Sequence, residues 1–486
     1  MEEVAKRTLS TDIRDNRKFL KEALGVDKSF DVIQLDVEYS SRDMTFYFID
    51  GFVKDEVLLH IMRELSKLGP DELRTDALPK LLKRYIPYVE IDTSDDTDQI
   101  ITSILSGTAA LIVDGIDRAI LIDARTYPAR NPDEPDTERV VRGSRDGFVE
   151  TLVFNTALIR RRIRERTLRM EFLQAGRRSK TDIVLCYIED IADMERVKQL
   201  KDHISKIDTD GLTMAEKSIE EYLSGRHWSP FPTVRYTERP DVAASHLYEG
   251  HIGIIVDGSP SVIITPATYW HHLQHAEEYR NKPVVGAYLR FVRFLAVWAS
   301  IFLLPLWYLL VIDPQYVPKG LSFIGPNEDG AIPLIFQFLI VETGIDMLRM
   351  AAIHTPSALA TALGLIAALM IGQVAVEVGL LTNEVILYLS VAAVGTFATP
   401  SYEMSQANRL VRLVLLVLTA LFHYYGFLIG TVLIFLLLVR HQSFGVPYLW
   451  PFIPFDWQSF KDVLIRFPMP LRNRRPEILH PQDPDR

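Results

Sequence analysis

A carboxylate and an amide lie in an apolar segment that is long enough to cross a bilayer. The segment GLIAALMIGQVAVEVGL (364–380) carries Gln373 and Glu377 one helical turn apart. In a symmetric oligomer this face could surround the axis, where a ring of Glu377 carboxylates would favour cations. Alternatively, Glu377 lies at the level of the lipid headgroups because the helix ends there. The sequence leaves both interpretations open.

The opposite face of this predicted helix carries a stripe of small residues. Small side chains at helical spacing allow two helices to approach each other closely within a membrane. The sequence therefore predicts a helix-packing face made of Gly364, Ala368, Gly372, Ala375 and Gly379.

A second group of ionisable residues follows another apolar run. The run 331–341 is too short to span a bilayer, and Glu342, Asp346 and Arg349 follow it on one helical face. Such a face cannot contact lipid. An internal Asp346–Arg349 ion pair that holds helices together and a role in lining a water path are equally compatible with this pattern.

Residue types that support enzyme chemistry are not arranged in a catalytic pattern. Cys186 is the single cysteine, which excludes an intramolecular disulfide framework, and its place in DIVLCYIED indicates a small residue of a buried strand. His271 and His275 have a spacing that can bind metal, but a third ligand is missing nearby. The chain contains no Gly-rich phosphate loop, nucleophile elbow or HExxH motif. We predict no enzyme activity, no cofactor and no metal.

The charge distribution argues against nucleic acid as a partner. The net charge is −10, whereas phosphate binding needs a basic face. The densest cationic cluster is interpreted as a solvated helix face, or one that contacts anionic lipid or an acidic neighbouring subunit. It contains Arg160, Arg161, Arg162, Arg164, Arg166 and Arg169.

The first half of the chain has the pattern of an α+β region. FDVIQLDVEY and MTFYFIDGF alternate with period two, and KDEVLLHIMRELSKL then has helical spacing. Two predicted hairpins with Asp-Gly turns have the same sequence pattern. Gly250, Asp257 and Gly258 of the second have the same spacing as Gly107, Asp114 and Gly115 of the first. Two related subdomains are the simplest explanation, although convergent hairpins would give the same match.

The second half of the chain contains the long apolar runs. The segment 294–312 is the first predicted span, and the basic stretch before it places the N-terminal region in the cytoplasm. Further spans are predicted at 357–376, 385–402 and 413–439, of which the last is long enough to require tilt or protrusion. His423, in the last span, is expected to be hydrogen-bonded within the bundle.

The fold class is thus an α+β N-terminal cytoplasmic region of two related subdomains, followed by an α-helical transmembrane bundle of four to five spans. If 331–350 spans, the C-terminal tail lies outside; if it is re-entrant, the tail lies inside. The aromatic tail is expected at the membrane interface. The predicted boundaries are a lead-in at 1–30, subdomains at 31–140 and 141–280, a membrane domain at 284–440 and a tail at 441–486.

Four segments resemble signature blocks of a known family. PTVRYTERPDVAASHLYEGHIGIIVDGSPSVIITPATYW, RGSRDGFVETLVFNTALIRRR, GQVAVEVGL and SFGVPYL are similar to the A subunits of GerA-type spore germinant receptors, in the same order. The resemblance covers about residues 30–455. LKEALGVDKSFD and DGFVKD are more similar to sporulation members of that family than to its nutrient-receptor A subunits.

The resemblance implies a biological setting that no residue spacing indicates. It implies a multi-pass protein of the spore inner membrane, with the N-terminal domain on the core side. It also implies a homo-oligomeric ring, expected to be a pentamer, that conducts ions during germination together with other integral membrane germination proteins. The expected function is a subunit of a cation channel, and the alternative is a non-conducting scaffold that recruits germination partners. Catalytic residues do not carry over, since the family has none.

Overall fold

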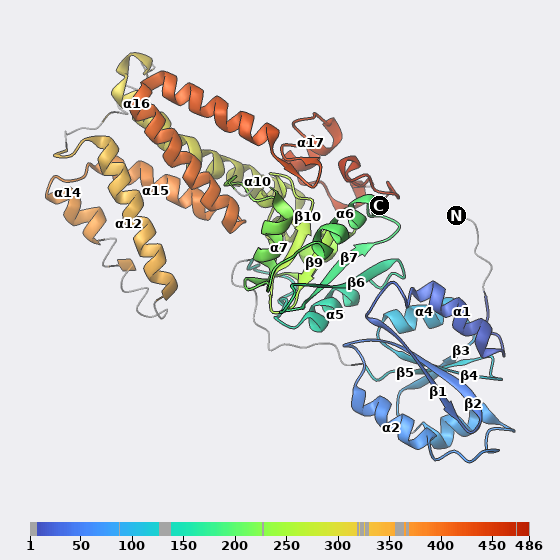
Figure 1. Cartoon of the computed structure of the whole chain (residues 1–486). Coiled ribbons are helices and arrows are strands. Elements are labelled where there is room, and N and C mark those ends of the chain that lie inside the picture. Colours follow the sequence, from blue (N-terminus) through green and yellow to red (C-terminus); the bar gives the residue numbers. More distant parts are fainter. Residues whose placement is uncertain are drawn as a thin grey trace.

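The computed structural model describes two α+β subdomains followed by a helical region and a C-terminal tail (Figure 1). The described residues are 7–86, 88–125, 138–225, 228–317, 320, 325, 330–354, 364–365, 369–472 and 474–485. The predicted order of strand, strand and helix, then a helix and a hairpin, is found in the first subdomain.

The first subdomain is built on a five-stranded sheet with helices on both faces. Its strand order is β1-β2-β4-β5-β3, and all neighbouring strands are antiparallel. One hydrophobic core lies beneath α1 and α4, and a second lies beneath α2 on the other face. The elements are α1 (Ile13–Leu24), β1 (Val32–Tyr39), β2 (Arg42–Ile49), α2 (Asp55–Leu65), α3 (Ala77–Lys80), β3 (Ile91–Ser94), α4 (Thr97–Leu105), β4 (Ala109–Val113) and β5 (Ala119–Ile122).

The second subdomain repeats this arrangement. Its strand order is β6-β7-β9-β10-β8, which is the order of the first sheet strand for strand. The elements are α5 (Leu152–Arg162), β6 (Leu168–Ala175), β7 (Thr181–Ile188), α6 (Met194–Ser205), α7 (Ala215–Ser224), β8 (Arg235–Thr237), α8 (Pro240–Leu247), β9 (Ile252–Val256) and β10 (Val262–Thr265). The short α9 (Ala276–Arg280) follows and leads to the helical region.

Side-chain contacts repeat together with the strand order. Asn16 at the start of α1 bonds both backbone groups of Ser10, and Asn155 at the start of α5 bonds those of Val149 in the same way. In each hairpin turn the aspartate accepts from the first amide of that helix, Asp114 in one subdomain and Asp257 in the other. Such detail favours two related subdomains over convergent hairpins.

The N-terminal helix is part of the first subdomain rather than a lead-in. Asp12 caps α1 by accepting from the Arg14 amide, and Gly25 ends the helix in the left-handed conformation at φ +67°. Leu20 and Leu24 on its apolar face are buried in the first core. Burial of this face makes α1 a structural element of the sheet.

The arginine cluster is largely used inside the chain. Arg160 is fully buried and makes a bidentate pair with Asp31, at 2.9 and 3.1 Å, which ties α5 to the start of β1. Arg162 pairs with Asp146 at 2.6 Å and Arg169 with Glu189 at 2.6 Å. The predicted solvated face is therefore wrong for these three arginines. Each has an acidic partner outside the cluster, and that of Arg160 lies 129 residues away in the sequence.

The single cysteine is structural, as predicted. Cys186 lies in β7 and is completely buried, and burial raises the pKa of its thiol above the usual range. A buried neutral thiol is a small apolar residue and not a nucleophile.

The helical region begins with one continuous helix that contains a π-helical turn. It runs through α10 (Pro283–Trp298), the turn Ala299–Leu303 and α11 (Leu304–Ile312). Then come α12 (Leu334–His354), α14 (Ala375–Glu377), α15 (Asn383–Phe397) and α16 (Tyr402–Arg440). Among the described residues, two helices are long and apolar enough to span a membrane, Pro283–Ile312 and Tyr402–Arg440. The predicted count of four to five spans is not established, and half of 357–376 lies outside the described residues.

The last predicted span is a helical hairpin and not one tilted helix. His423 has φ 54° and ψ −134°, so α16 divides into two arms, 402–422 and 424–440 (Figure 1). A methyl group added to Gly426 would collide with the carbonyl oxygen of Leu418, which shows that the arms lie against each other near the tip. The sequence analysis explained the length of this segment by a tilted helix, whereas in the structure the same length forms the two arms of the hairpin.

The C-terminal tail returns to the second subdomain. It contains β11 (Gln442–Ser443), β12 (Val446–Pro447) and α17 (Trp457–Leu464). Arg475 donates to the carbonyl of Tyr248 at 2.8 Å, and the Gln482 amide donates to the carbonyl of Ile191 at 3.0 Å. Because the tail contacts this subdomain, both lie on the same side of any membrane that the helices cross.

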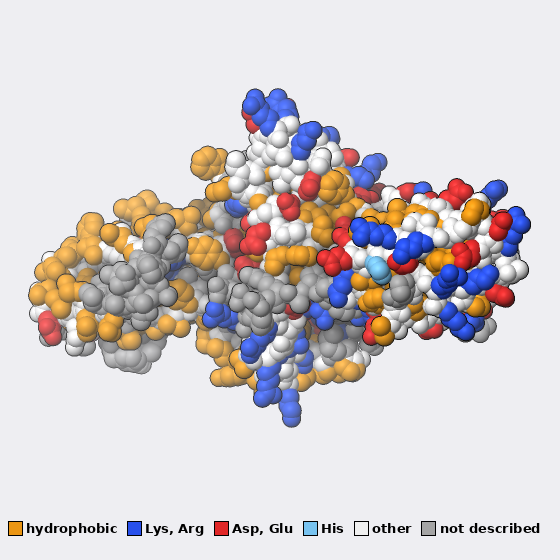
Figure 2. Space-filling model, turned by 90° about the horizontal axis from the view of Figure 1, so that it is seen from below, with side chains coloured by type: hydrophobic (Ala, Val, Ile, Leu, Met, Phe, Trp, Pro, Cys, Tyr) orange, Lys and Arg blue, Asp and Glu red, His pale blue; other side chains and the backbone are white. Residues whose placement is uncertain are grey.

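The two ends of the molecule have different surfaces. Figure 2 shows hydrophobic side chains over the end formed by the helices and mixed charges over the end formed by the first subdomain. Exposed apolar residues are frequent along α16, for example Tyr425 at 69 % and Leu433 at 55 % exposure. A continuous apolar surface of this kind suits lipid or a neighbouring helix.

Candidate functional site in the helical region

A buried glutamate joins two helices of the helical region. Glu342 of α12 is 2 % exposed and accepts hydrogen bonds from Arg409 and Arg412 of α16. Arg412 Nη2 lies 2.6 Å from Glu342 Oε1, and Arg409 Nε lies 3.2 Å from Oε2. A charge removed from water needs such a partner, because its desolvation is otherwise uncompensated.

Two more charges extend this contact into what we call the charge network, formed by Glu342, Asp346, Arg349, Arg409 and Arg412. Asp346 binds Arg409 of α16 and also Arg349, which follows three residues later on the same helix. The predicted Asp346–Arg349 ion pair is therefore present. It does not itself join helices, since both residues belong to α12; the arginines of α16 make the connection.

Arg412 connects the charge network to two further elements. Its Nη1 donates to the carbonyl oxygen of Ser300 at 2.6 Å and to Thr396 Oγ1 at 3.3 Å. Ser300 lies in the π-helical turn of the first helix, where the altered backbone spacing leaves carbonyl groups available to outside donors. One guanidinium thus bonds groups on three other elements.

A cavity of about 190 Å³ lies beside the charge network. Its polar lining could hold water next to charged groups. The lining includes Glu342, Arg349, Thr396, Gln406, Arg409 and Arg412. Both interpretations of the predicted polar face, helix association and a water path, are compatible with this cavity.

Gln373 and Glu377 lie on an exposed surface near the end of a short helical segment. Gln373 belongs to the π-helical turn Met370–Val374, and Glu377 is the last residue of α14. Both side chains are exposed, and no ion pair involves Glu377 within the described part of the chain. The chain turns at Gly379, with φ +71°, directly after Glu377. Whether this carboxylate faces an axis or a headgroup layer stays a prediction.

The small-residue stripe finds no partner helix within the described chain. A methyl group added to Gly364, Gly372 or Gly379 would meet no described atom within 4 Å, whereas Ala375 packs against the core of the helical region. Ala368 lies outside the described residues. The packing role of these glycines stays a prediction.

Close packing within the chain occurs at a glycine that the sequence analysis did not select. A methyl group on Gly395 of α15 would collide with the carbonyl oxygen of Ala296 in α10. Ala392 and Ala398 lie three residues before and after Gly395, so small residues at helical spacing were an available signal that the sequence analysis did not use.

His423 lies at the tip of the hairpin. Its Nδ1 is 3.2 Å from Asp313 Oδ1, at the end of α11. The expected hydrogen bond of His423 is thus present, but at a half-exposed tip and not in the interior of the bundle.

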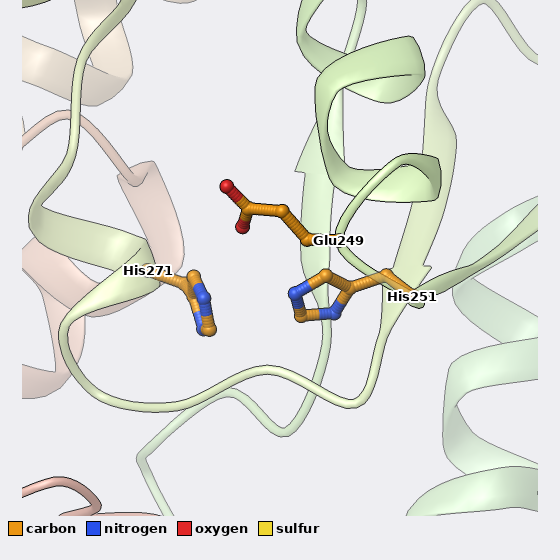
Figure 3. Close-up of side chains that lie close together, drawn as sticks. All are labelled: Glu249, His251 and His271. Atoms are coloured by element: carbon orange, nitrogen blue, oxygen red, sulfur yellow. The ribbon is translucent and has the colours of Figure 1, made fainter. Parts of the chain in front are cut away.

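The two histidines with metal-binding spacing do not come together. His275 caps α9 through the Glu277 amide, while His271 lies beside His251 and Glu249 (Figure 3). The ligand atoms of Glu249, His251 and His271 lie within 4.8 Å of one another. Sequence reasoning missed this group, because His251 and Glu249 are separated from His271 by a hairpin.

Arg409 and Arg412 were likewise missed as members of a site. Both precede the predicted span 413–439, so the sequence analysis does not include them among the polar residues of the helices. One signal in the sequence could have identified them. Arg409 and Arg412 are three residues apart and Glu342 and Asp346 are four apart, so each pair lies on one face of its helix and the two faces carry opposite charges.

Comparison with known proteins identifies the family. The model of the "Bacillus/Clostridium GerA spore germination protein" family matches residues 18–478. "Stage V sporulation protein AF" of Bacillus subtilis (strain 168) is 49% identical over 468 residues, which are 96% of this chain and 95% of that protein. "Spore germination protein KA" of the same organism is 31% identical over 467 residues, 94% of this chain and 85% of that protein.

A solved structure is also similar. It is the crystal structure of the N-terminal domain of the A subunit of the Bacillus megaterium spore germinant receptor GerK3, which is 28% identical, with 55% of this chain and 98% of that chain covered and a TM-score of 0.43. Taken with the match of the family model to nearly the whole chain, the relatives establish that the chain belongs to the GerA family of spore germination proteins.

Proposed function

We propose that this spore germination membrane protein is a subunit of an oligomeric channel that conducts cations during exit from dormancy. It is placed in the spore inner membrane as a multi-pass protein, with its N-terminal subdomains on the core side. The proposal draws on the family and on one observation of the helical region. That observation is the segment 369–380, which exposes Gln373 and Glu377 beside glycines that contact nothing else in the described chain.

A segment of this kind suits a contact between subunits around an axis. Glycines that contact no described atom permit a neighbouring helix to approach closely, and exposed polar groups in an apolar region need partners other than lipid. A ring of Glu377 side chains would concentrate cations at the mouth of a shared path. The homo-oligomer, expected to be a pentamer, and the membrane partners of the complex are parts of the same proposal.

A non-conducting scaffold is the second candidate. The charge network supports it, because Glu342 and Asp346 are bound by arginines and so are suited to holding helices together. In this case the helices would anchor the protein, and the two subdomains would recruit germination partners.

The state of assembly and the conduction of ions separate the two candidates. Full-length protein purified in detergent should form one defined oligomer by mass photometry, and liposomes that contain it should release potassium. A monomer would remove the basis for a shared axial path. A defined oligomer without potassium flux would favour the scaffold.

A further inference from the structure

We propose that Glu249, His251 and His271 bind a divalent transition-metal ion, with zinc as the expected metal. The three ligand atoms lie within 4.8 Å of one another. Figure 3 shows the rings of His251 and His271 approaching each other from opposite sides, with the Glu249 carboxylate above them. A zinc ion lies about 2.0–2.2 Å from nitrogen and carboxylate ligands, so it would draw these atoms somewhat closer together. This inference is independent of the proposed channel.

His251 has the arrangement of a metal ligand that is already oriented. Its Nδ1 lies 2.8 Å from the carbonyl oxygen of Pro266, which places the proton on Nδ1 and the lone pair on Nε2. The side chain is completely buried, and Nε2 has no hydrogen-bond partner among the described residues. A buried polar atom without a partner requires an explanation, and a bound metal ion supplies one.

His271 can supply a second imidazole nitrogen to the ion. A neutral imidazole binds a metal through the ring nitrogen that carries no proton. His271 Nδ1 accepts a hydrogen bond from the Thr268 amide at 3.0 Å. If His271 coordinates the ion through Nε2, the ring proton moves to Nδ1. Thr268 Oγ1, also 3.0 Å from Nδ1, can then accept a hydrogen bond from Nδ1, and the hydrogen bond from the Thr268 amide is lost.

Glu249 is held in place by an arginine from the tail. Arg472 Nη2 lies 3.0 Å from Glu249 Oε1, and this pair orients the carboxylate. A cavity of about 260 Å³, lined by Glu249 and His246 among others, lies beside the cluster and offers an entry path and space for a water ligand. Three protein ligands with one open position are a common zinc arrangement.

The charges around the cluster select among metals. Arg235 and Arg472 add positive charge close by, and the cluster contains a single carboxylate. Calcium and magnesium need several oxygen ligands, so they should bind poorly here. Imidazole ligands with one carboxylate favour zinc or a similar transition metal.

The position of the cluster gives the metal a structural consequence. His251 begins the β9 hairpin of the second subdomain, His271 lies on the segment that leads to α10, and Arg472 belongs to the tail. A bound ion would therefore fasten the start of the first candidate span to the second subdomain, with Arg472 bringing the tail to the same point.

Zinc binding by the full-length protein in detergent tests the proposal. After treatment with a chelator and its removal, titration with zinc chloride should show one ion per chain and raise the apparent melting temperature. Cobalt(II) in place of zinc should give the visible absorption of a low-coordinate site with nitrogen and oxygen ligands. Absence of binding by the unchanged protein would overturn the proposal.

Variants locate the site and control for folding. His251→Gln should weaken zinc binding by about 100-fold or more and abolish the cobalt absorption. His272→Gln removes an equally buried imidazole next to the cluster, and His60→Gln removes an exposed one; both should bind zinc as the unchanged protein does. If His251→Gln does not fold, Glu249→Gln serves as the second variant. Zinc binding that is unaffected by the folded cluster variant would assign the metal to surface histidines and overturn the proposal.

Discussion

At the scale of single residues, the helical region depends on how its buried charges are paired. Glu342 is bound by two arginines, and the Arg412 guanidinium also bonds a backbone carbonyl and a hydroxyl. Removal of this carboxylate would leave the buried Arg412 guanidinium without its counter-charge and Arg409 with Asp346 alone. The charge network is thus more sensitive to loss of Glu342 than to loss of the half-buried Arg349.

Replacement of Glu342 by Leu should destabilise the protein strongly. Breaking a buried pair by removing one partner costs about 3–5 kcal/mol, whereas an exposed pair within one helix contributes about 0.3–0.5 kcal/mol. The fraction of monodisperse protein in detergent after graded heating should fall much earlier for Glu342→Leu than for the control Arg349→Ala. Equal behaviour of the two variants would show that the network does not hold the helices together.

Glu377 provides the test of a cation path at the level of one side chain. Glu377→Gln keeps the shape of the side chain but removes one negative charge per subunit, so potassium release from spores should become slower. Glu377→Lys reverses the charge and should slow release further. Ion release is measured at matched protein level, with the exposed Glu38→Gln of the first sheet as control.

The headgroup interpretation of Glu377 gives a different pattern. A lysine can extend to the interface as readily as a glutamate lies there, so both variants would then release ions normally. Equal rates in all variants would end the assignment of Glu377 to the path.

At the scale of elements, two glycine-mediated contacts have different meanings. Gly395 permits α15 to lie against α10 within one chain, while Gly372 contacts nothing in the described chain. The first contact belongs to folding, and the second is available to another subunit.

Substitution by leucine should separate these two roles. Gly395→Leu should lower the yield of folded protein, because the side chain would displace α10. Gly372→Leu should leave folding intact but reduce the yield of oligomer in mass photometry, since it blocks a close approach between chains. An unchanged oligomer in Gly372→Leu would mean that the stripe faces lipid.

The base of α10 shows why counting charges did not settle the topology. Arg290 is buried and bonds Glu278 at 2.7 Å as well as the carbonyls of Asp462 and Val463 in α17. Arg293 also pairs with Glu278. These arginines belong to the basic stretch before the first predicted span, and in the structure they bind the tail and the second subdomain.

At the scale of the whole molecule, the hairpin of α16 brings the tail back to the second subdomain. The tail and the subdomains therefore share one side of the membrane, and the segment after α11 lies at the opposite end of the first helix (Figure 1). Neither alternative for 331–350 included this, because both counted 413–439 as one span, whereas the chain folds back at His423.

Cysteine labelling should report this arrangement directly. In a Cys186→Ala background, a cysteine at the exposed Lys18 and one at Glu477 should label from one face, and one at Gln315 should label from the other. Labelling of positions 18 and 477 from opposite faces would contradict the hairpin.

Periodicity and turn residues determined much of the soluble fold by themselves. The positions of β1 and β2, the hairpin turns at Gly115 and Gly258, and the match between the two hairpins follow from local physics, since each depends on residues close together in the chain. Alternation does not describe the burial of β2, in which Met44–Tyr47 are all buried because helices cover both faces of the sheet. The role of Cys186 as a strand residue was predictable for the same reason.

The tertiary structure alone decided which distant groups meet. Arg160 with Asp31, Arg412 with Glu342 and His251 with His271 are brought together by the fold, and a single sequence contains no distance between them. The break at His423 was equally invisible, because a helical hairpin and one long helix have the same apolar composition. Local patterns are set by neighbours along the chain, whereas pairing of buried charges and the path of the chain depend on the free energy of the whole packed molecule.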